Sequence, residues 1–505
     1  MPATTEITRP NENVNVAVAQ RFAERARALL EGPAQTGRQL EERIWEILLE
    51  TGRELLTAGL ARACWETACE AGGGSPAGPL RLDDDYWLSQ TTTLGTVTVP
   101  LFAHRDGSRT HAPAREAVFP LHPQCRSSEL LLEWETRLGA QLPFRKAQEE
   151  LGFFTHGAVG LEDTTIARHL GIIGGLADRQ FQFRTLEDFR EILTKRATRD
   201  RKTKQPVVYI STDAHSLRRY VDDTWEAAWR NINGIRLWCV DRKSGRTIHL
   251  GGEYTWGDCH EVKQLFRSLA EEGYLPRNGC YGELKAQFVF LADGMPWIWE
   301  HVAPELPENT VEILDFYHAM EHVASYANAR FGVESPLAKA WYNQQRAALL
   351  GKRAYRRKKG VKRRGHKKSR SHRERQPRVH RSAHPHGAGE AFVRSLIDES
   401  VPSHCDDEHT EVVRYTGQHA HRMDYPAYRD RGFQVGSGAM ESLHRTGSQL
   451  RVKRPGTRWL PENALSVIRV RMMMLADRWT AFWESPELTQ RLVHAFRSGG
   501  PVYAC

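Results

Sequence analysis

Two apolar runs in the middle of the chain, each followed directly by an acid, most constrain what this sequence can fold into. The first is PVVYIST (206–212), followed by Asp213, and the second is QFVFLA (287–292), followed by Asp293. An unbroken apolar run is typical of a strand that is covered on both faces. An acid at the C-terminal end of such a strand meets solvent and ligands instead of the core. Each acid alone has a second interpretation as a turn or cap residue, so their joint placement carries the argument.

The remaining patterns complete a specific order of elements. Residues 234–242 and 246–254 flank the turn KSG and predict a hairpin. Residues 258–273 predict an amphipathic helix that stops at a glycine. A further strand is predicted over 310–314, ending at Asp315, and a helical stretch follows it. The order β-β-β-α-β-α-β-α is the arrangement of an RNase H-like domain with a mixed five-stranded sheet.

In such a sheet the first and fourth strands are neighbours, so Asp213 and Asp293 are expected side by side. Two carboxylates that close repel each other unless a cation neutralises them, and Mg²⁺ prefers such oxygen ligands. We expect the third acid to be Glu441, in VGSGAMES, where Gly436 and Gly438 allow a tight entry into a helix. Three carboxylates that hold two metal ions can activate a water or a 3′-hydroxyl for attack on a phosphodiester.

Two other acids compete for the first position. Asp222 and Asp223 lie close after the first predicted strand, but the surrounding stretch, YVDDTWEAAW (220–229), has a helical pattern. We therefore prefer Asp213.

The N-terminal region of the chain is predicted to be helical and to bind DNA. Residues 1–80 show apolar positions at three- and four-residue steps. The stretches 142–152 and 161–171 predict two short helices joined by a turn, as in a helix-turn-helix. Helical hairpins are common in any helical domain, so a purely structural role remains an alternative. Side chains expected to face a DNA groove are Thr165, Arg168 and His169.

Positive charge is concentrated in two segments. The net charge is only +9, but residues 352–381 are about half Lys and Arg. Such a segment repels itself, favours polyanions and orders on binding them. Its predicted DNA contacts are Lys358, Lys359, Arg363 and Arg364. A second basic stretch, 451–459, offers four phosphate contacts, with a solvated loop as the alternative: Arg451, Lys453, Arg454 and Arg458.

Three stretches carry a more specific resemblance. They are ADGMPWIWEHV (292–302), ILDFYHAMEHV (313–323) and the region 435–483, from VGSGAMES to TAFW. Together they resemble the DDE transposases of bacterial insertion sequences, most closely the ISKra-type group. The resemblance extends over roughly 90–480 and is thin before 200.

The resemblance implies a DNA transposase that uses Mg²⁺ or Mn²⁺, with two ions in each active site. Asp213, Asp293 and Glu441 would be its metal-binding catalytic acids, and His318 would assist near the scissile phosphate. The family usually has Asp-Gly at the first acid, whereas Ala214 follows it here. The implied partners are double-stranded DNA, as terminal inverted repeats and target, and further copies of the chain in a homodimer or higher oligomer.

Two other functions stay open: an inactive, transposase-derived DNA-binding protein, and another RNase H-like nuclease such as a junction resolvase or an RNA-guided enzyme.

No apolar run in the chain reaches the length of roughly 20 residues that is needed to span a bilayer. Its eight cysteines follow no disulfide spacing. We therefore expect a cytoplasmic protein of the bacterial nucleoid, without membrane contact. The spacing of the cysteines with His122 gives only weak support for zinc.

The predicted fold is thus multidomain α+β, with an RNase H-like α/β core that is interrupted by a basic, largely helical insertion. A helical and helix-turn-helix region precedes the core. The expected domains are an N-terminal helical region (1–80), a DNA-binding region (90–200), a first core segment (205–330), the insertion (331–431) and a second core segment with Glu441 (432–490).

Overall fold

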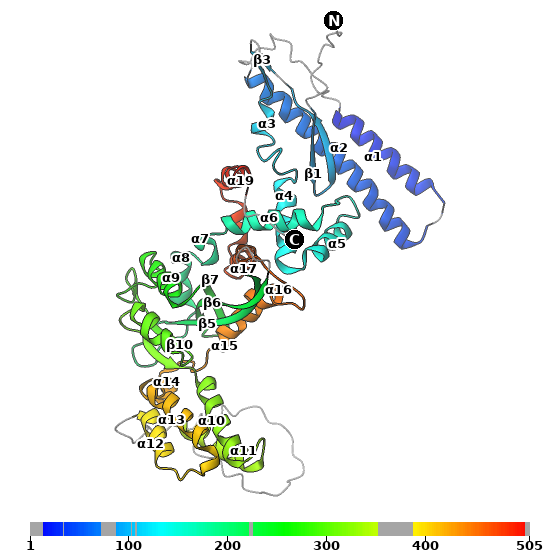
Figure 1. Ribbon diagram of the computed structural model, residues 1–505. Helices are drawn as coiled ribbons and strands as arrows, with labels where there is room; N and C mark the ends of the chain where they lie inside the picture. Colours follow the sequence, from blue (N-terminus) through cyan, green and yellow to red (C-terminus); the bar gives the residue numbers. More distant parts are fainter. Residues whose placement is uncertain are drawn as a thin grey trace, which may run out of the picture. The chain divides into compact units, whose positions relative to one another are not determined.

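The chain forms two compact units, which are described separately (Figure 1). Unit 1 comprises Met1–Phe181, Arg218–Ala228 and Gln449–Cys505. Unit 2 comprises Gln182–Leu217 and Trp229–Ser448. The computed structural model describes residues 14–33, 35–71, 87–102, 104–106, 109–221, 226–351 and 387–499.

A mixed five-stranded sheet forms the centre of unit 2. In the sheet the strands lie in the order β11-β10-β5-β6-β7. β10 pairs in parallel with both β11 and β5, while β6 and β7 are antiparallel. This order is consistent with an RNase H-like core and confirms the predicted mixed sheet. The strands are β5 (Val207–Tyr220), β6 (Ala227–Val240), β7 (Thr247–Trp256), β10 (Gln287–Ala292) and β11 (Val311–Leu314).

Two expectations about the first strands are wrong. β5 does not end before Asp213 but continues to Tyr220, so this acid lies within the strand. The stretch 220–229, interpreted as helical, contains the start of β6 at Ala227 instead. Beyond Asp213, buried His215 and Leu217 alternate with partly exposed neighbours, which is the period of a strand. Asp222 and Asp223 lie outside the described residues.

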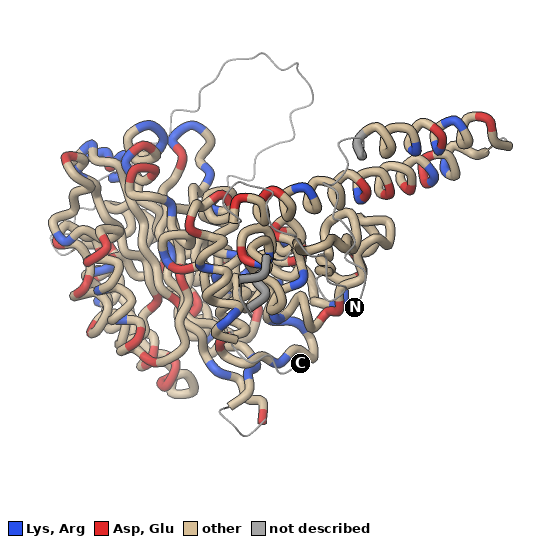
Figure 2. The backbone as a smooth tube through the Cα atoms, turned by 90° about the horizontal axis from the view of Figure 1, so that it is seen from above, with Lys and Arg blue, Asp and Glu red and all other residues tan. Residues whose placement is uncertain are grey.

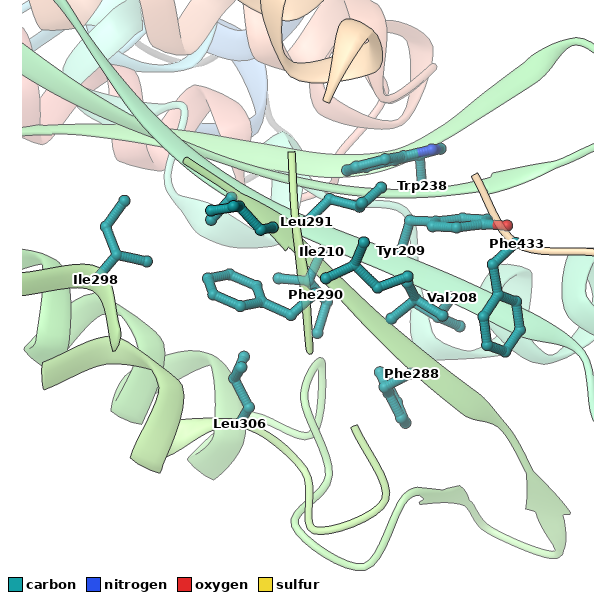
Figure 3. Close-up of a cluster of buried hydrophobic side chains, with 14 of the residues drawn as sticks. Val208, Tyr209, Ile210, Trp238, Phe288, Phe290, Leu291, Ile298, Leu306 and Phe433 are labelled. Carbon is teal, nitrogen blue, oxygen red and sulfur yellow. The ribbon is translucent and has the colours of Figure 1, made fainter. Parts of the chain in front are cut away.

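The core of unit 2 lies on both faces of β10, whose six residues are all buried. On one face Phe290 meets the ring of Phe266 from α9 (Cys259–Glu271), at 6.3 Å between centroids. Ile298, in the π-helical turn η1 (Ile298–Val302), and Leu306 come from the segment after β10 (Figure 3). Tyr209 stacks on Trp238 at 5.4 Å. The predicted helix 258–273 is confirmed, with four of its apolar side chains buried: Val262, Leu265, Phe266 and Leu269.

A helical insertion leaves the sheet after β11 and returns to the same place. It begins with α10 (Phe316–Phe331) and α11 (Pro336–Leu349), and beyond a stretch outside the described residues it continues with α12 (Gly387–Ile397), α13 (Asp406–Gln418) and α14 (Tyr425–Arg431). The returning chain is bonded to the start of α10: the Phe316 amide donates to Val435 O at 2.9 Å, and the Ser437 amide donates to the Asp315 carboxylate. The predicted contacts Lys358, Lys359, Arg363 and Arg364 lie outside the described residues.

Unit 1 begins with two paired helices, α1 (Val14–Glu31) and α2 (Gly37–Ala71). Acidic and basic residues are interspersed along both (Figure 2). Glu54 joins the helices, because it accepts from Arg21 at 3.0 Å and from Arg25 at 2.7 Å. An antiparallel hairpin packs on α2 and consists of β1 (Trp87–Thr92) and β2 (Gly95–Pro100). Among the described helices, none is both long and apolar enough to cross a bilayer.

The rest of unit 1 is a helical bundle built around α6 (Asp163–Leu176). Its neighbours are α4 (Glu129–Gln141), α5 (Phe144–Phe154), α17 (Pro461–Leu475) and α19 (Leu488–Arg497). α6 and α17 approach closely at Gly174, where an added Cβ would overlap the backbone of Ser466. The next residue, Gly175, has open space around the same position.

This pair of glycines gives a prediction about packing. Gly174→Ala should destabilise unit 1 by about 1–3 kcal/mol, because the two helices have to separate to admit one methyl group. Gly175→Ala, the matched control, should be neutral or stabilising by up to ~1 kcal/mol, since alanine favours a helix. Thermal unfolding of the two full-length variants checks this. Equal melting temperatures would contradict the close approach of α6 and α17.

Candidate active site and nucleic-acid contacts

Asp213 lies within β5 and Asp293 directly after the last residue of β10, at level positions of two adjacent parallel strands. β5 and β10 pair from Val207 opposite Gln287 to Ile210 opposite Phe290, an offset of 80 residues (287 − 207 = 80). Asp213 and Asp293 differ by the same 80 (293 − 213 = 80). The register of the sheet, and not only the order of its strands, therefore brings the two acids together.

The electrostatics of Asp293 agree with this placement. Burial raises the pKa of its carboxyl above the ordinary value, and the neighbouring carboxylates of Asp213 and Asp315 raise it further. A hydrogen bond from the Met295 amide to Asp293 Oδ1, at 3.1 Å, and the nearby His318 oppose that rise in pKa. The charged form of Asp293 is thus poorly stabilised by the protein alone, and a cation would relieve this.

Each carboxylate oxygen of Asp213 has a close polar neighbour. Its Oδ1 accepts from the amide of Ala214 at 2.7 Å, and its Oδ2 lies 3.3 Å from Nε2 of His444. His444 was not predicted as a site residue from the sequence. Its spacing of three residues after Glu441, in one continuous helical segment, was the available signal.

Glu441 lies on α15 (Gly438–Leu443), which packs on the sheet. Gly234 of β6 leaves room for Met440, and buried Arg236 donates to the carbonyl of Ala439. Glu441 itself is exposed. Among the described residues, no three His, Cys, Asp or Glu side chains are grouped closely enough to hold a metal ion. The three predicted acids therefore share a unit, and two of them are adjacent, but they do not form a closed ligand set.

Asp315, at the end of β11, is a fully buried cap. Its Oδ1 accepts from the amides of Tyr317 and His318 at 2.6 and 3.2 Å, which caps α10, and its Oδ2 accepts from the amide of Ser437. One carboxylate thus fixes both the helix that carries His318 and the segment that leads to Glu441.

His318, in the first turn of α10, faces several acids. Burial alone would lower its pKa, but the carboxylates of Asp315, Glu321, Asp293 and Asp213 outweigh burial and raise it. The imidazole therefore holds its proton to a higher pH than a free histidine. Its Nδ1 lies 3.4 Å from Glu321.

The prediction that Arg451 is a surface contact for phosphate is wrong. Its side chain is buried, donates to Gly139 O at 2.8 Å, and lies over the rings of Phe144 and Trp459. Burial lowers its pKa to about 9. The guanidinium closes the C-terminal end of α4, where carbonyl groups lack partners within the helix. The other three residues of this stretch are exposed: Lys453, Arg454 and Arg458.

The expected DNA-reading face of α6 is corrected in part. His169 is buried, and its Nδ1 lies 2.8 Å from buried Glu135 of α4. Arg168 is exposed but donates to Gln124 O at 3.2 Å, and Thr165 is half-buried. His169 is therefore a core residue, and the proposal that α6 reads DNA rests on Thr165 and Arg168 alone.

Comparisons with known proteins add little. No protein-family model and no curated protein matches this chain. Among solved structures, the Drosophila P element transposase strand transfer complex has a TM-score of 0.25 and 11% identity. The match covers 72% of this chain and 83% of that chain. A likeness this distant carries no conclusion about function.

Proposed function

We propose that this protein is a DNA transposase of the DDE type, which cleaves the ends of a mobile element and joins the 3′-hydroxyl to target DNA. The observation that carries the proposal is that Asp213, within β5, and Asp293, directly after β10, share the 80-residue offset at which these two parallel strands pair. The raised pKa of Asp293 supports it, because an acid pair without a cation is poorly stabilised. The strand order and the resemblance to insertion-sequence transposases support the same class.

Asp213, Asp293 and Glu441 would hold two Mg²⁺ or Mn²⁺ ions. When bound, these ions would favour deprotonation of water or a 3′-hydroxyl and stabilise the leaving oxygen. The residues present fit hard cations in their donor chemistry, since two adjacent carboxylates and a third acid supply only oxygen. The α15 segment would have to bring Glu441 to the pair.

His318 would act on the phosphate rather than on the ions. Its raised pKa favours the imidazolium form, which attracts and donates to a phosphate oxygen. Asp315 would hold His318 in place through the cap of α10.

A strand-cleavage and transfer assay tests the proposal. Purified full-length protein is incubated with the genomic DNA that flanks its own gene, with Mg²⁺ or Mn²⁺ and with EDTA. We expect cleavage at the element ends and joined products only with the divalent ion. Specific binding without cleavage under either ion would favour the inactive derivative. Cleavage set by DNA shape or by a guide RNA, without joining, would favour another RNase H-like nuclease.

The exposed basic residues after the Glu441 segment are proposed to bind DNA phosphates. Replacing Lys453, Arg454 and Arg458 by Gln should weaken binding to all sequences similarly and reduce the salt slope of log Kd by up to about 3. The matched control replaces three exposed basic residues in and beside the β6–β7 turn: Arg242, Lys243 and Arg246. Binding measured from 50 to 300 mM salt checks this (roughly the range over which phosphate contacts are lost). An equal loss in both triple variants would show only a general effect of charge.

A further inference from the structure

His444, which the proposed mechanism does not use, lies against the first acid of the site. Its Nε2 is 3.3 Å from Asp213 Oδ2, and its side chain is 5% exposed. That nitrogen has no aligned hydrogen-bond partner among the described residues, although the ion-pair distance to Asp213 is short. A buried ring nitrogen that lies near a carboxylate without a well-aligned hydrogen bond costs free energy of folding. Such a group is typical of a functional site.

The other nitrogen of the ring is fixed from behind. His444 Nδ1 lies 3.0 Å from the hydroxyl of Tyr254, on β7, and Tyr254 is 3% exposed. A Tyr254 hydroxyl that donates to Nδ1 leaves the ring proton on Nε2, facing Asp213. The ring of His215 closes one side of His444, with 4.7 Å between centroids.

We infer that Tyr254 and His444 form a relay that positions the Asp213 carboxylate for its metal ion. The inference rests on the proposed function, because it takes Asp213 as a metal ligand. Metal-ligating carboxylates need hydrogen-bond partners that fix which oxygen faces the ion. Here the Ala214 amide donates to Oδ1, and His444 Nε2 lies at ion-pair distance from Oδ2. Because His444 follows Glu441 by three residues, the relay also ties the α15 segment to the first acid.

In this chain the residue after Asp213 supplies only its amide, while the second oxygen is held from the segment that follows α15. His444 and Tyr254 are therefore positioning residues, which act through Asp213 and do not touch substrate.

Direct Mn²⁺ binding tests the relay separately from activity. Free Mn²⁺ is followed by electron paramagnetic resonance in a titration of the full-length protein and its variants. We expect His444→Leu to weaken Mn²⁺ binding about 10- to 100-fold, and Tyr254→Phe to weaken it about tenfold. His444→Gln, whose amide can still donate to Asp213, should retain more of the affinity than His444→Leu. The half-saturating Mn²⁺ for cleavage should rise in the same order.

The matched control is His249→Leu, which removes another buried histidine from β7. Neither ring nitrogen of His249 has a hydrogen-bond partner among the described residues, and it makes no ion pair with Asp213. Its Mn²⁺ affinity should equal that of the unchanged protein. If His444→Leu lowers the melting temperature, Tyr254→Phe, which loses only a hydroxyl, still tests the relay.

The outcomes separate the two proposals. Mn²⁺ affinity that is unchanged in both His444→Leu and Tyr254→Phe, in a protein that does bind and cleave, overturns the relay and leaves the transposase proposal standing. Equal weakening in His249→Leu also overturns it, since any buried change would then have that effect. A protein without changes that neither binds Mn²⁺ nor cleaves DNA overturns the proposed function itself.

Discussion

Asp293→Asn should abolish DNA cleavage while DNA binding remains. The change removes one of the two adjacent carboxylates but keeps the shape of the side chain and its hydrogen bond from the Met295 amide. We expect cleavage to fall on the order of 10³-fold or more, because metal-assisted charge stabilisation supplies several kcal/mol in such reactions. Single-turnover cleavage of element-end DNA, beside a gel-shift measurement of binding, checks both effects.

Glu300→Gln is the matched control for this variant. Glu300 is an exposed acid seven residues further along, in the turn η1, and it has no place in the proposed site. Its cleavage rate should stay within about twofold of the unchanged protein, as for a surface substitution away from the site. Cleavage by Asp293→Asn at the rate of the control would contradict the proposed role of the acid pair.

His169→Gln should destabilise unit 1 by about 3–5 kcal/mol near pH 7, since it leaves Glu135 buried without its charge partner. Burial lowers the pKa of His169, but Glu135 and a hydrogen bond with Cys125 outweigh it and raise the pKa to about 10. A raised folded-state pKa means that the stabilisation is fully present below the unfolded value near 6.5. It is then lost as the pH rises through about 10.

A double variant, His169→Gln with Glu135→Gln, supplies the reference without either charge. Relative to it, the unchanged protein should lose stability between about pH 6.5 and 10. Hydrogen exchange of α4 and α6 in the full-length chain measures this locally. A constant difference across that pH window would show that the pair is not ionised.

The parts of the core that were predicted correctly are those whose structure is decided by one local feature of the sequence. QFVFLA is apolar throughout and fully buried, so its length, its strand conformation and the position of the acid after it could be predicted from the sequence. The strand that ends at Asp315, the helix that follows it and the amphipathic pattern of α9 were predicted for the same reason, because their signals are local. The pairing offset that makes Asp213 and Asp293 level is not local, and only the fold shows it.

The wrong predictions from the sequence have a physical cause as well. The second half of β5 is mostly polar, so pairing with β6 decides that it is a strand. A short stretch of sequence does not contain that pairing. Arg451 and His169 look like surface groups by residue type. Each is buried because a distant partner accepts its hydrogen bond, at Gly139 and Glu135 respectively. A basic or titratable residue in a polar-looking stretch thus cannot be assigned to DNA from sequence alone.

The bonds that join Phe316 to Val435 and Asp315 to Ser437 have a consequence for how such a chain can diversify. The described part of the excursion through α10–α14 leaves and re-enters the sheet at these bonds, and Arg422 and Tyr425 bond it to β11 as well. Because the entropic cost of closing a loop rises only slowly with its length, the chain between α10 and Val435 can change in length at little cost in free energy. These bonds therefore make the position of α10, with His318, independent of the length of the insertion.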